Sequence, residues 1–263
     1  MFLIFISCLF LGAITGFLAG LLGIGGGLIV VPALVYLLPQ LGISNEVIMP
    51  MALATSLSTI VITSSSATLA HHKNRNIPWN ITKPLMFIVA FGALVGAFIA
   101  DHLSAQALTS FFAIAVVILA SYMLLSIRLQ RYKEMPSKIK LQFISLLTGV
   151  VASLMGMAGG AILVPILTYF GTPLRHCIGI ATVCGVMVAL FGSLGYIISG
   201  FGNELLPAWS LGYVYLPALS GIALTSSLFA PVGVKYAAKV PVQTLKKLFA
   251  IFLIIVAMKM MLT

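Results

Sequence analysis

The chain has 263 residues, of which 61% are hydrophobic and only 7% charged, and its mean hydropathy is +1.20. A soluble core cannot bury this much apolar surface, so the composition excludes a soluble globular domain and predicts a protein embedded in the lipid bilayer. The net charge of +10 would suggest a nucleic-acid partner for a soluble protein. In a membrane protein, basic loops set orientation instead, and no nucleic-acid partner is expected.

Apolar segments follow one another along the whole chain. In chain order they cover residues 1–22, 28–38, 47–70, 84–100 and 107–127, and then 141–156, 161–171, 177–199, 211–232 and 248–262. As helices, the longer segments reach about 30 Å, which is the thickness of the hydrocarbon core. The sequence therefore predicts an all-α, multi-pass protein of the inner or plasma membrane. Residues 1–22 have no basic flank and no clear cleavage site, so we interpret them as a first helix and not as a signal peptide.

The second half of the chain repeats the first. Residues 15–32, "TGFLAGLLGIGGGLIVVP", align without a gap with residues 148–165, "TGVVASLMGMAGGAILVP", and ten of the eighteen positions are identical. The apolar segments of the two halves also match in order, which indicates an internal duplication. We divide the chain into a first membrane repeat (1–127), a basic linker (128–140) and a second membrane repeat (141–263).

The charges indicate that the two repeats are inverted. Five segments per repeat is an odd number, so the second repeat would start on the opposite side of the membrane from the first. If the linker is cytoplasmic, nearly all of the fourteen Lys and Arg residues are inside and three of the four acidic residues outside, as the positive-inside rule requires. Both termini are then outside. The alternative, a parallel duplication, would scatter the basic clusters over both faces.

A short apolar run follows each glycine cluster. As a helix, residues 28–38 span about 16 Å, roughly half of the hydrocarbon core. We therefore expect short broken or re-entrant helices after the glycines, where irregular backbone must be buried in protein or line a watery cavity. A helix that begins beyond such a break points free N–H groups and its positive dipole end into the gap, which favours an anion.

With inverted repeats, two such helix starts meet near the middle of the membrane, as in transporters built from inverted repeats. The third segments add hydroxyl groups in "ATSLST" and "IATVCG", which can hydrogen-bond oxyanion oxygens. The predicted substrate-binding residues are Gly25, Gly26, Gly27, Leu28, Thr55 and Ser56 in the first repeat, and Gly159, Gly160, Ala161 and Thr182 in the second. Glycines spaced four apart, such as Gly12 and Gly16, are better explained by close helix packing.

These motifs resemble a known family. The pattern "TGFLAGLLGIGGGLIVVPAL", followed by "ATSLSTIVITSSSATLAHHKNRNIPW" and a weaker second copy, is similar to that of the TauE/SafE sulfite-exporter-like membrane transporters over essentially the whole chain. The resemblance implies movement of small sulfur-containing anions, such as sulfite or organosulfonates, across the cell membrane, often outward. The glycines, Thr55, Ser56 and Thr182 match the family pattern. Ala158 and Val183 depart from the first copy, so the two half-sites are unequal.

The remaining residues favour a transporter over an enzyme. Four dispersed acidic residues and four histidines form no catalytic or metal-binding set, so no catalytic residue, metal or cofactor is predicted. No acidic residue falls inside a predicted span, and export driven by the membrane potential is expected. The alternative is a channel-like or partner-dependent subunit that passes another small anion or sulfur species, with Cys184 as a reactive thiol. The sequence is also compatible with a homo-oligomer.

Overall fold

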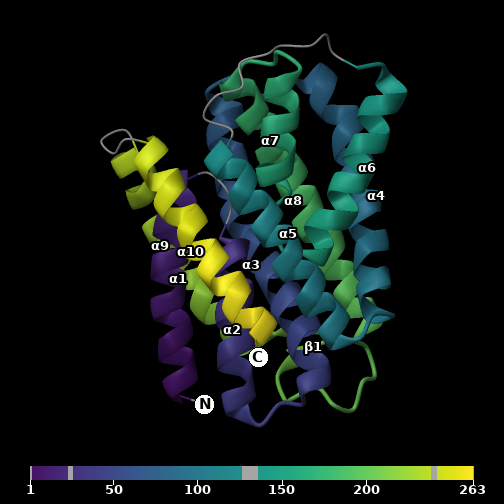
Figure 1. Cartoon of the computed structure of the whole chain (residues 1–263), viewed down its shortest axis with the longest axis vertical. Helices are drawn as coiled ribbons and strands as arrows, with labels where there is room; N and C mark the ends of the chain where they lie inside the picture. The colour runs from purple at the N-terminus through teal and green to yellow at the C-terminus, as the bar shows by residue number, and fades with distance from the viewer. Residues whose placement is uncertain (1, 23–25, 126–135, 238–241, 263) are drawn as a thin grey trace.

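A computed structural model of the chain describes residues 2–22, 26–125, 136–237 and 242–262. These residues form ten α-helices, one short 3-10 helix and one two-stranded hairpin (Figure 1). In chain order, the elements are α1 (Phe2–Leu22), α2 (Gly27–Leu37), η1 (Leu38–Leu41), α3 (Asn45–Lys73), α4 (Trp79–Asp101), α5 (Ala105–Leu125), α6 (Lys138–Leu154), α7 (Gly160–Tyr169), α8 (Leu174–Ser199), β1 (Ser210–Leu211), β2 (Val214–Tyr215), α9 (Leu216–Ala237) and α10 (Val242–Leu262).

The helix lengths confirm the predicted all-α membrane architecture. Five helices, α3, α4, α5, α8 and α9, each contain a stretch that is long and apolar enough to cross a membrane. By contrast, α2 has 11 residues and α7 has 10, which corresponds to about 15–16 Å each. The short helices expected after the glycine motifs are therefore present in both repeats.

Each helix of the second repeat runs opposite to its counterpart in the first. In Figure 1, α1 rises from the N-terminus at the bottom whereas α6 descends from the top, and α2 descends whereas α7 rises. The helices α3 and α8, α4 and α9, and α5 and α10 are opposed in the same way. The predicted inversion of the repeats is thus visible in the directions of the helices.

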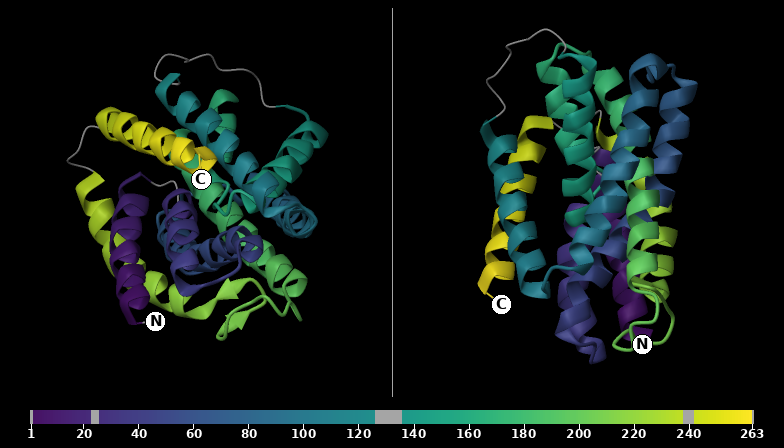
Figure 2. Two further views of the ribbon diagram at one scale, coloured as in Figure 1. Left: turned by 60° about the horizontal axis from the view of Figure 1, so that its bottom comes forward. Right: turned by 90° about the vertical axis from the view of Figure 1, so that its right-hand side faces the viewer.

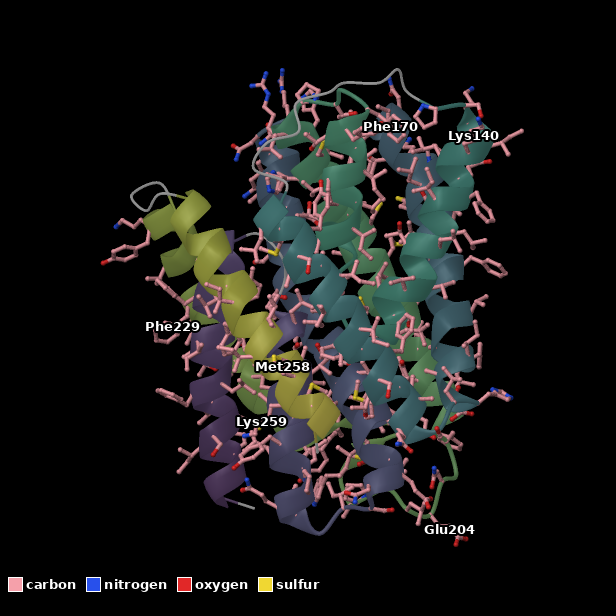
Figure 3. The ribbon with its side chains drawn as sticks, viewed as in Figure 1. Lys140, Phe170, Glu204, Phe229, Met258 and Lys259 are labelled. Atoms are coloured by element: carbon pink, nitrogen blue, oxygen red, sulfur yellow. The ribbon has the colours of Figure 1, made fainter. Side chains whose placement is uncertain are left out.

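Charge separates the two ends of the helical bundle. We call the end where α3, α5 and α9 finish the basic end, and the opposite end the acidic end. The basic end carries Lys73, Arg75, Lys83, Lys138, Lys140, Arg175 and Lys235, and the acidic end carries Glu46, Asp101 and Glu204. Lys140 and Glu204 mark the two ends in Figure 3. Lys259 is an exception, since it lies toward the acidic end with its Nζ 4.7 Å from the centroid of the Tyr36 ring.

The two repeats are interlaced in space. The first helix of each repeat packs against the fourth helix of the other, so that α1 lies along α9 and α6 lies along α4 (Figure 2). Gly16 of α1 touches the backbone of Ser226, and its repeat partner Gly149 of α6 touches the backbone of Val89. Small residues permit this close approach of two backbones. The glycines predicted to serve helix packing therefore do so between the repeats.

One predicted helix begins later than expected. The apolar segment 211–232 starts with the β1–β2 hairpin, and α9 begins only at Leu216. Gly212 adopts a positive φ of 52° in the hairpin turn, and the neighbouring valine and tyrosines favour strands. Pro217 then occupies the first turn of α9, where its missing N–H leaves no helical bond unmade.

Candidate functional site

The two glycine-rich turns predicted from the repeat lie against each other in the interior. Gly27, the first residue of α2, faces the carbonyl oxygen of Gly156, and a Cβ atom added to Gly27 would overlap that oxygen. Gly156 and Gly159 have φ values of +60° and +68°, which side chains of L-residues rarely allow. Glycine is therefore required at position 27 by close contact, and at positions 156 and 159 by the backbone conformation.

Helix α2 begins at this contact, α7 begins at Gly160 just after the second glycine turn, and the two short helices run in opposite directions (Figure 1). The carbonyl oxygen of Gly26 accepts the first hydrogen bonds of α2, and the carbonyl oxygen of Gly159 accepts those of α7. The N–H groups at the two helix starts belong to Gly27, Leu28, Gly160 and Ala161. Among the described residues these N–H groups have no backbone acceptor, so each start presents free donors and a positive dipole end.

Hydroxyl groups of α3 bind the surrounding elements. The buried Ser56 hydroxyl donates a hydrogen bond of 2.7 Å to the carbonyl oxygen of Gly156 in the second glycine turn. Thr55 Oγ1 accepts a hydrogen bond of 3.0 Å from the backbone N–H of Tyr215 in β2. Thr59 donates to the carbonyl oxygen of Ser56 at 2.7 Å. The hydroxyl groups of the predicted site residues Thr55 and Ser56 are therefore already hydrogen-bonded to other parts of the protein.

A narrow pocket with room for about one water molecule, partly open to the surface, lies beside the start of α2. Its walls come from α1, α2, α3 and α9, and they include Thr15, Gly16, Ala19, Gly26, Val30, Thr59, Ile60, Thr63, Ile222 and Ser226. Four of these residues carry hydroxyl groups. Gly26 is the predicted site residue in the wall, and the predicted Gly25 lies outside the described residues. The pocket therefore combines a helix start with a polar, uncharged lining.

The second half-site is lined mainly by apolar groups. A Cβ atom added to Gly159 would find Ala152, Thr148 and Val188 at ordinary contact distances of 3.4–3.7 Å. The Thr182 hydroxyl donates to the carbonyl oxygen of Gly179 in its own helix at 2.9 Å. Apolar atoms thus lie around Gly159, whereas hydroxyl-bearing residues line the pocket beside Gly26, so the two half-sites differ in their lining.

Of the four hydroxyl-bearing pocket residues, only Thr59 lies in a motif that the sequence analysis singled out, and Thr15, Thr63 and Ser226 were missed. A signal existed for Thr15, because it is identical to its repeat partner Thr148 and opens the aligned motif. A signal existed for Thr63 as well, since it lies one helical turn beyond Thr59 on the same face of α3. Ser226 had no such signal, because α9 belongs to the other repeat and its contact with α1 is a tertiary feature.

The β1–β2 hairpin covers the acidic end of the interior. Tyr213 and Tyr215 are buried, and the Tyr213 hydroxyl donates a 2.8 Å hydrogen bond to Asp101 Oδ1 at the end of α4. The backbone N–H of Tyr213 donates to the carbonyl oxygen of Tyr196 in α8 at 3.4 Å. Burial, followed by the hydrogen bond to the Asp101 carboxylate, raises the pKa of Tyr213 above its usual value. The hairpin is therefore fixed to three helices, α3, α4 and α8.

Residues 8–260 match the family described as "Sulfite exporter TauE/SafE". The chain belongs to the TauE/SafE family. A "Probable membrane transporter protein" of Haemophilus influenzae is 41% identical, with 100% of both chains covered. A relative of the same printed description from Methanocaldococcus jannaschii is 26% identical over 95% of this chain and 93% of its own. The "Probable membrane transporter protein YunE" of Bacillus subtilis is 24% identical over 76% and 81% of the two chains. No solved structure is significantly similar.

Family membership confirms the resemblance inferred from the glycine motifs and identifies a membrane transporter. In the part of this TauE/SafE chain that the structure describes, no group of three or more His, Cys, Asp or Glu side chains could hold a metal ion. Cys8, Cys177 and Cys184 are free and buried. The groups that can donate hydrogen bonds near the glycine turns are backbone N–H and hydroxyl groups, which suit a small oxyanion. In this structure the pocket hydroxyls donate to carbonyl oxygens of their own helices, so binding an oxyanion would require them to turn.

Proposed function

We propose that this TauE/SafE protein exports small sulfur-containing anions, such as sulfite or organosulfonates, by alternating access around a site between the starts of α2 and α7. The observation that carries the proposal is the contact between the start of α2 and the glycine turn that precedes α7, beside a pocket lined partly by hydroxyl groups. Helix N-termini attract anions without a fixed positive charge. Inverted repeats build comparable mid-membrane sites in secondary transporters.

The distribution of acidic residues is compatible with an anionic substrate. Glu46, Asp101 and Glu204 lie at the acidic end and are exposed, so they add no negative charge to the wall of the pocket. With the inside of the cell negative, each negative charge that leaves gains about 2.3 kcal/mol per 100 mV. Export driven by the membrane potential then needs no buried proton-carrying carboxylate.

Unequal packing of equivalent helices supports alternating access. Gly195 of α8 packs so closely on α4 that an added Cβ atom would lie 2.6 Å from the Cβ of Ala97. The repeat counterparts of these two helices, α3 and α9, form opposite walls of the pocket instead. If the two repeats exchanged these arrangements, the first pocket would close and an equivalent opening would form in the second repeat.

The direct test is flux in liposomes that contain the purified protein. Sulfite, thiosulfate and a small organosulfonate are supplied in turn, with and without an imposed potassium-diffusion potential. We expect flux of at least one of these anions, and we expect it to increase when the potential drives the anion outward. Absence of flux for all three with folded protein would overturn the proposal and favour a partner-dependent subunit.

The site itself is tested by variants in the pocket wall. Thr59→Val removes one hydroxyl with little change in volume, and we expect about a tenfold loss of flux at low substrate concentration, as for one lost hydrogen bond to an anion. Gly26→Leu, which would fill the pocket, should abolish flux. Thr109→Val in α5 is the matched control, because its hydroxyl also bonds its own helix but does not line the pocket. Equal flux in Thr59→Val and Thr109→Val would contradict the site.

A further inference from the structure

We propose that the β1–β2 hairpin, Ser210–Tyr215, is a gate that closes the substrate pathway at the acidic end, and that the hydrogen bond from Tyr213 to Asp101 is its latch. This inference rests on the proposed function, because a gate requires a solute that passes it. It adds to that function by naming which end is closed in this structure and which contact must break to open it.

The hairpin reaches from the acidic end into the interior. Tyr213, Val214 and Tyr215 are 6%, 2% and 3% exposed, which is unusual for a connection between two membrane helices. A Cβ atom on Gly212 would overlap the backbone of Ile197, and one on Gly200 would lie 2.5 Å from the backbone nitrogen of Tyr213. The turn of the hairpin therefore lies directly against the end of α8, with no space between the two backbones.

The hairpin also touches the residues next to the glycine turns. The N–H of Tyr215 binds Thr55, and the adjacent Ser56 binds the carbonyl oxygen of Gly156. A continuous chain of contacts therefore links the hairpin, α3 and the second glycine turn. Movement of Tyr215 away from α3 would free the Thr55 hydroxyl for a passing anion.

The pocket lies on the other side of this contact. Helix α3 starts at the acidic end (Figure 1), and the pocket residues Thr59 and Thr63 follow Thr55 by about one and two helical turns toward the basic end. The hairpin therefore separates the pocket from the acidic end. We infer that this structure is the state in which the site is closed toward the acidic end.

The latch is the contact that can be released most simply. Asp101 is exposed at the end of α4, whereas Thr55, which accepts from the N–H of Tyr215, is buried. Asn203 Nδ2 also donates to the Tyr213 hydroxyl, at the longer distance of 3.5 Å. A hydrogen bond to an ionised acceptor contributes more than a neutral one. Loss of this one bond should therefore raise the population of the open state about tenfold without unfolding the bundle.

The experiment measures access to the pocket and not transport. In a background without native cysteines, Thr59→Cys is the reporter in the pocket, and Glu204→Cys in a separate sample identifies which vesicle face is the acidic end. A membrane-impermeant maleimide is applied from that face. We expect slow labelling of position 59 in the parent. Addition of Tyr213→Phe or Asp101→Ala should speed labelling about tenfold, whereas the controls Tyr122→Phe and Glu46→Ala should not.

Three results separate the possible outcomes. If Tyr213→Phe and Asp101→Ala each speed labelling and adding Asp101→Ala to Tyr213→Phe brings no further increase, the latch is supported, because both changes remove the bond between Tyr213 and Asp101. If labelling from the acidic face is already fast in the parent, or is unchanged in both variants with folded protein, the gate is overturned. If labelling responds but no anion crosses the liposome membrane, the gate stands and the proposed function fails.

Discussion

One hydroxyl group, that of Ser56, connects the first repeat to the glycine turn of the second. Ser56→Ala would leave the buried carbonyl oxygen of Gly156 without this donor. We expect a loss of about 1–2 kcal/mol in the free energy of unfolding, seen as a lower midpoint of thermal unfolding in detergent. Ser65→Ala is the control, since Ser65 bonds only the carbonyl oxygen of Val61 in its own helix. Equal midpoints for the two variants would contradict this role of Ser56.

The hydroxyl of Tyr213 makes the stability of the folded protein depend on pH. Because its pKa is raised in the folded state, the protonated form is favoured by folding. The stability it contributes is complete below the ordinary tyrosine pKa of about 10 and is lost as the pH rises through the higher folded value. The difference in tyrosinate absorbance between the parent and Tyr213→Phe should therefore show a titration above about pH 10. A titration at or below pH 10 would be inconsistent with the buried, hydrogen-bonded hydroxyl.

At the scale of elements, the start of α2 gives a sharp comparison between neighbouring glycines. A Cβ atom on Gly26 would meet Thr15 at an ordinary 3.4 Å, whereas one on Gly27 would overlap the Gly156 carbonyl oxygen. We expect Gly26→Ala to fold normally, and Gly27→Ala to lose about 1–3 kcal/mol as the two turns are forced apart. Unfolding midpoints measured in the same detergent test this. Similar midpoints for both variants would mean that the two turns are not in contact.

The sequence predicted some elements and missed others for identifiable reasons. The short helices α2 and α7 were predictable because the glycine motif occurs twice and a short apolar run follows each copy. The hairpin was not, since residues 211–215 are as apolar as the helix that follows them. The hydrogen-bond partners of Thr55 and Ser56 could not be predicted either, because one lies on that hairpin and the other on the opposite repeat.

For the whole molecule, the separation of charge predicts orientation. Basic residues at one end should keep that end in the cytoplasm. With Ser137→Cys at the start of α6 and Glu204→Cys at the acidic end, each in a background without native cysteines, an impermeant maleimide added to intact cells should label position 204 at once. Position 137 should react only after the cells are permeabilised. The reverse pattern would show that the basic end faces outward.

The inversion of the repeats could be predicted at this scale, because the odd number of segments per repeat and the distribution of Lys and Arg residues both indicate it. The interlacing of the repeats could not. Periodicity and composition show that α1 and α9 are apolar, but nothing in a single sequence says that Gly16 will lie on Ser226 and not on a neighbour within its own repeat.

That interlacing constrains how the protein is made. The Thr225 hydroxyl of α9 donates to the carbonyl oxygen of Leu9 in α1, although the two residues are 216 positions apart. At the usual 5–20 residues per second of synthesis, α1 waits about 10–40 s in the bilayer before its partner leaves the ribosome. During that interval the small-residue face of α1 and its backbone carbonyls are covered by lipid or by another protein. Biogenesis of this transporter thus includes a period in which its first helix is inserted but unassembled.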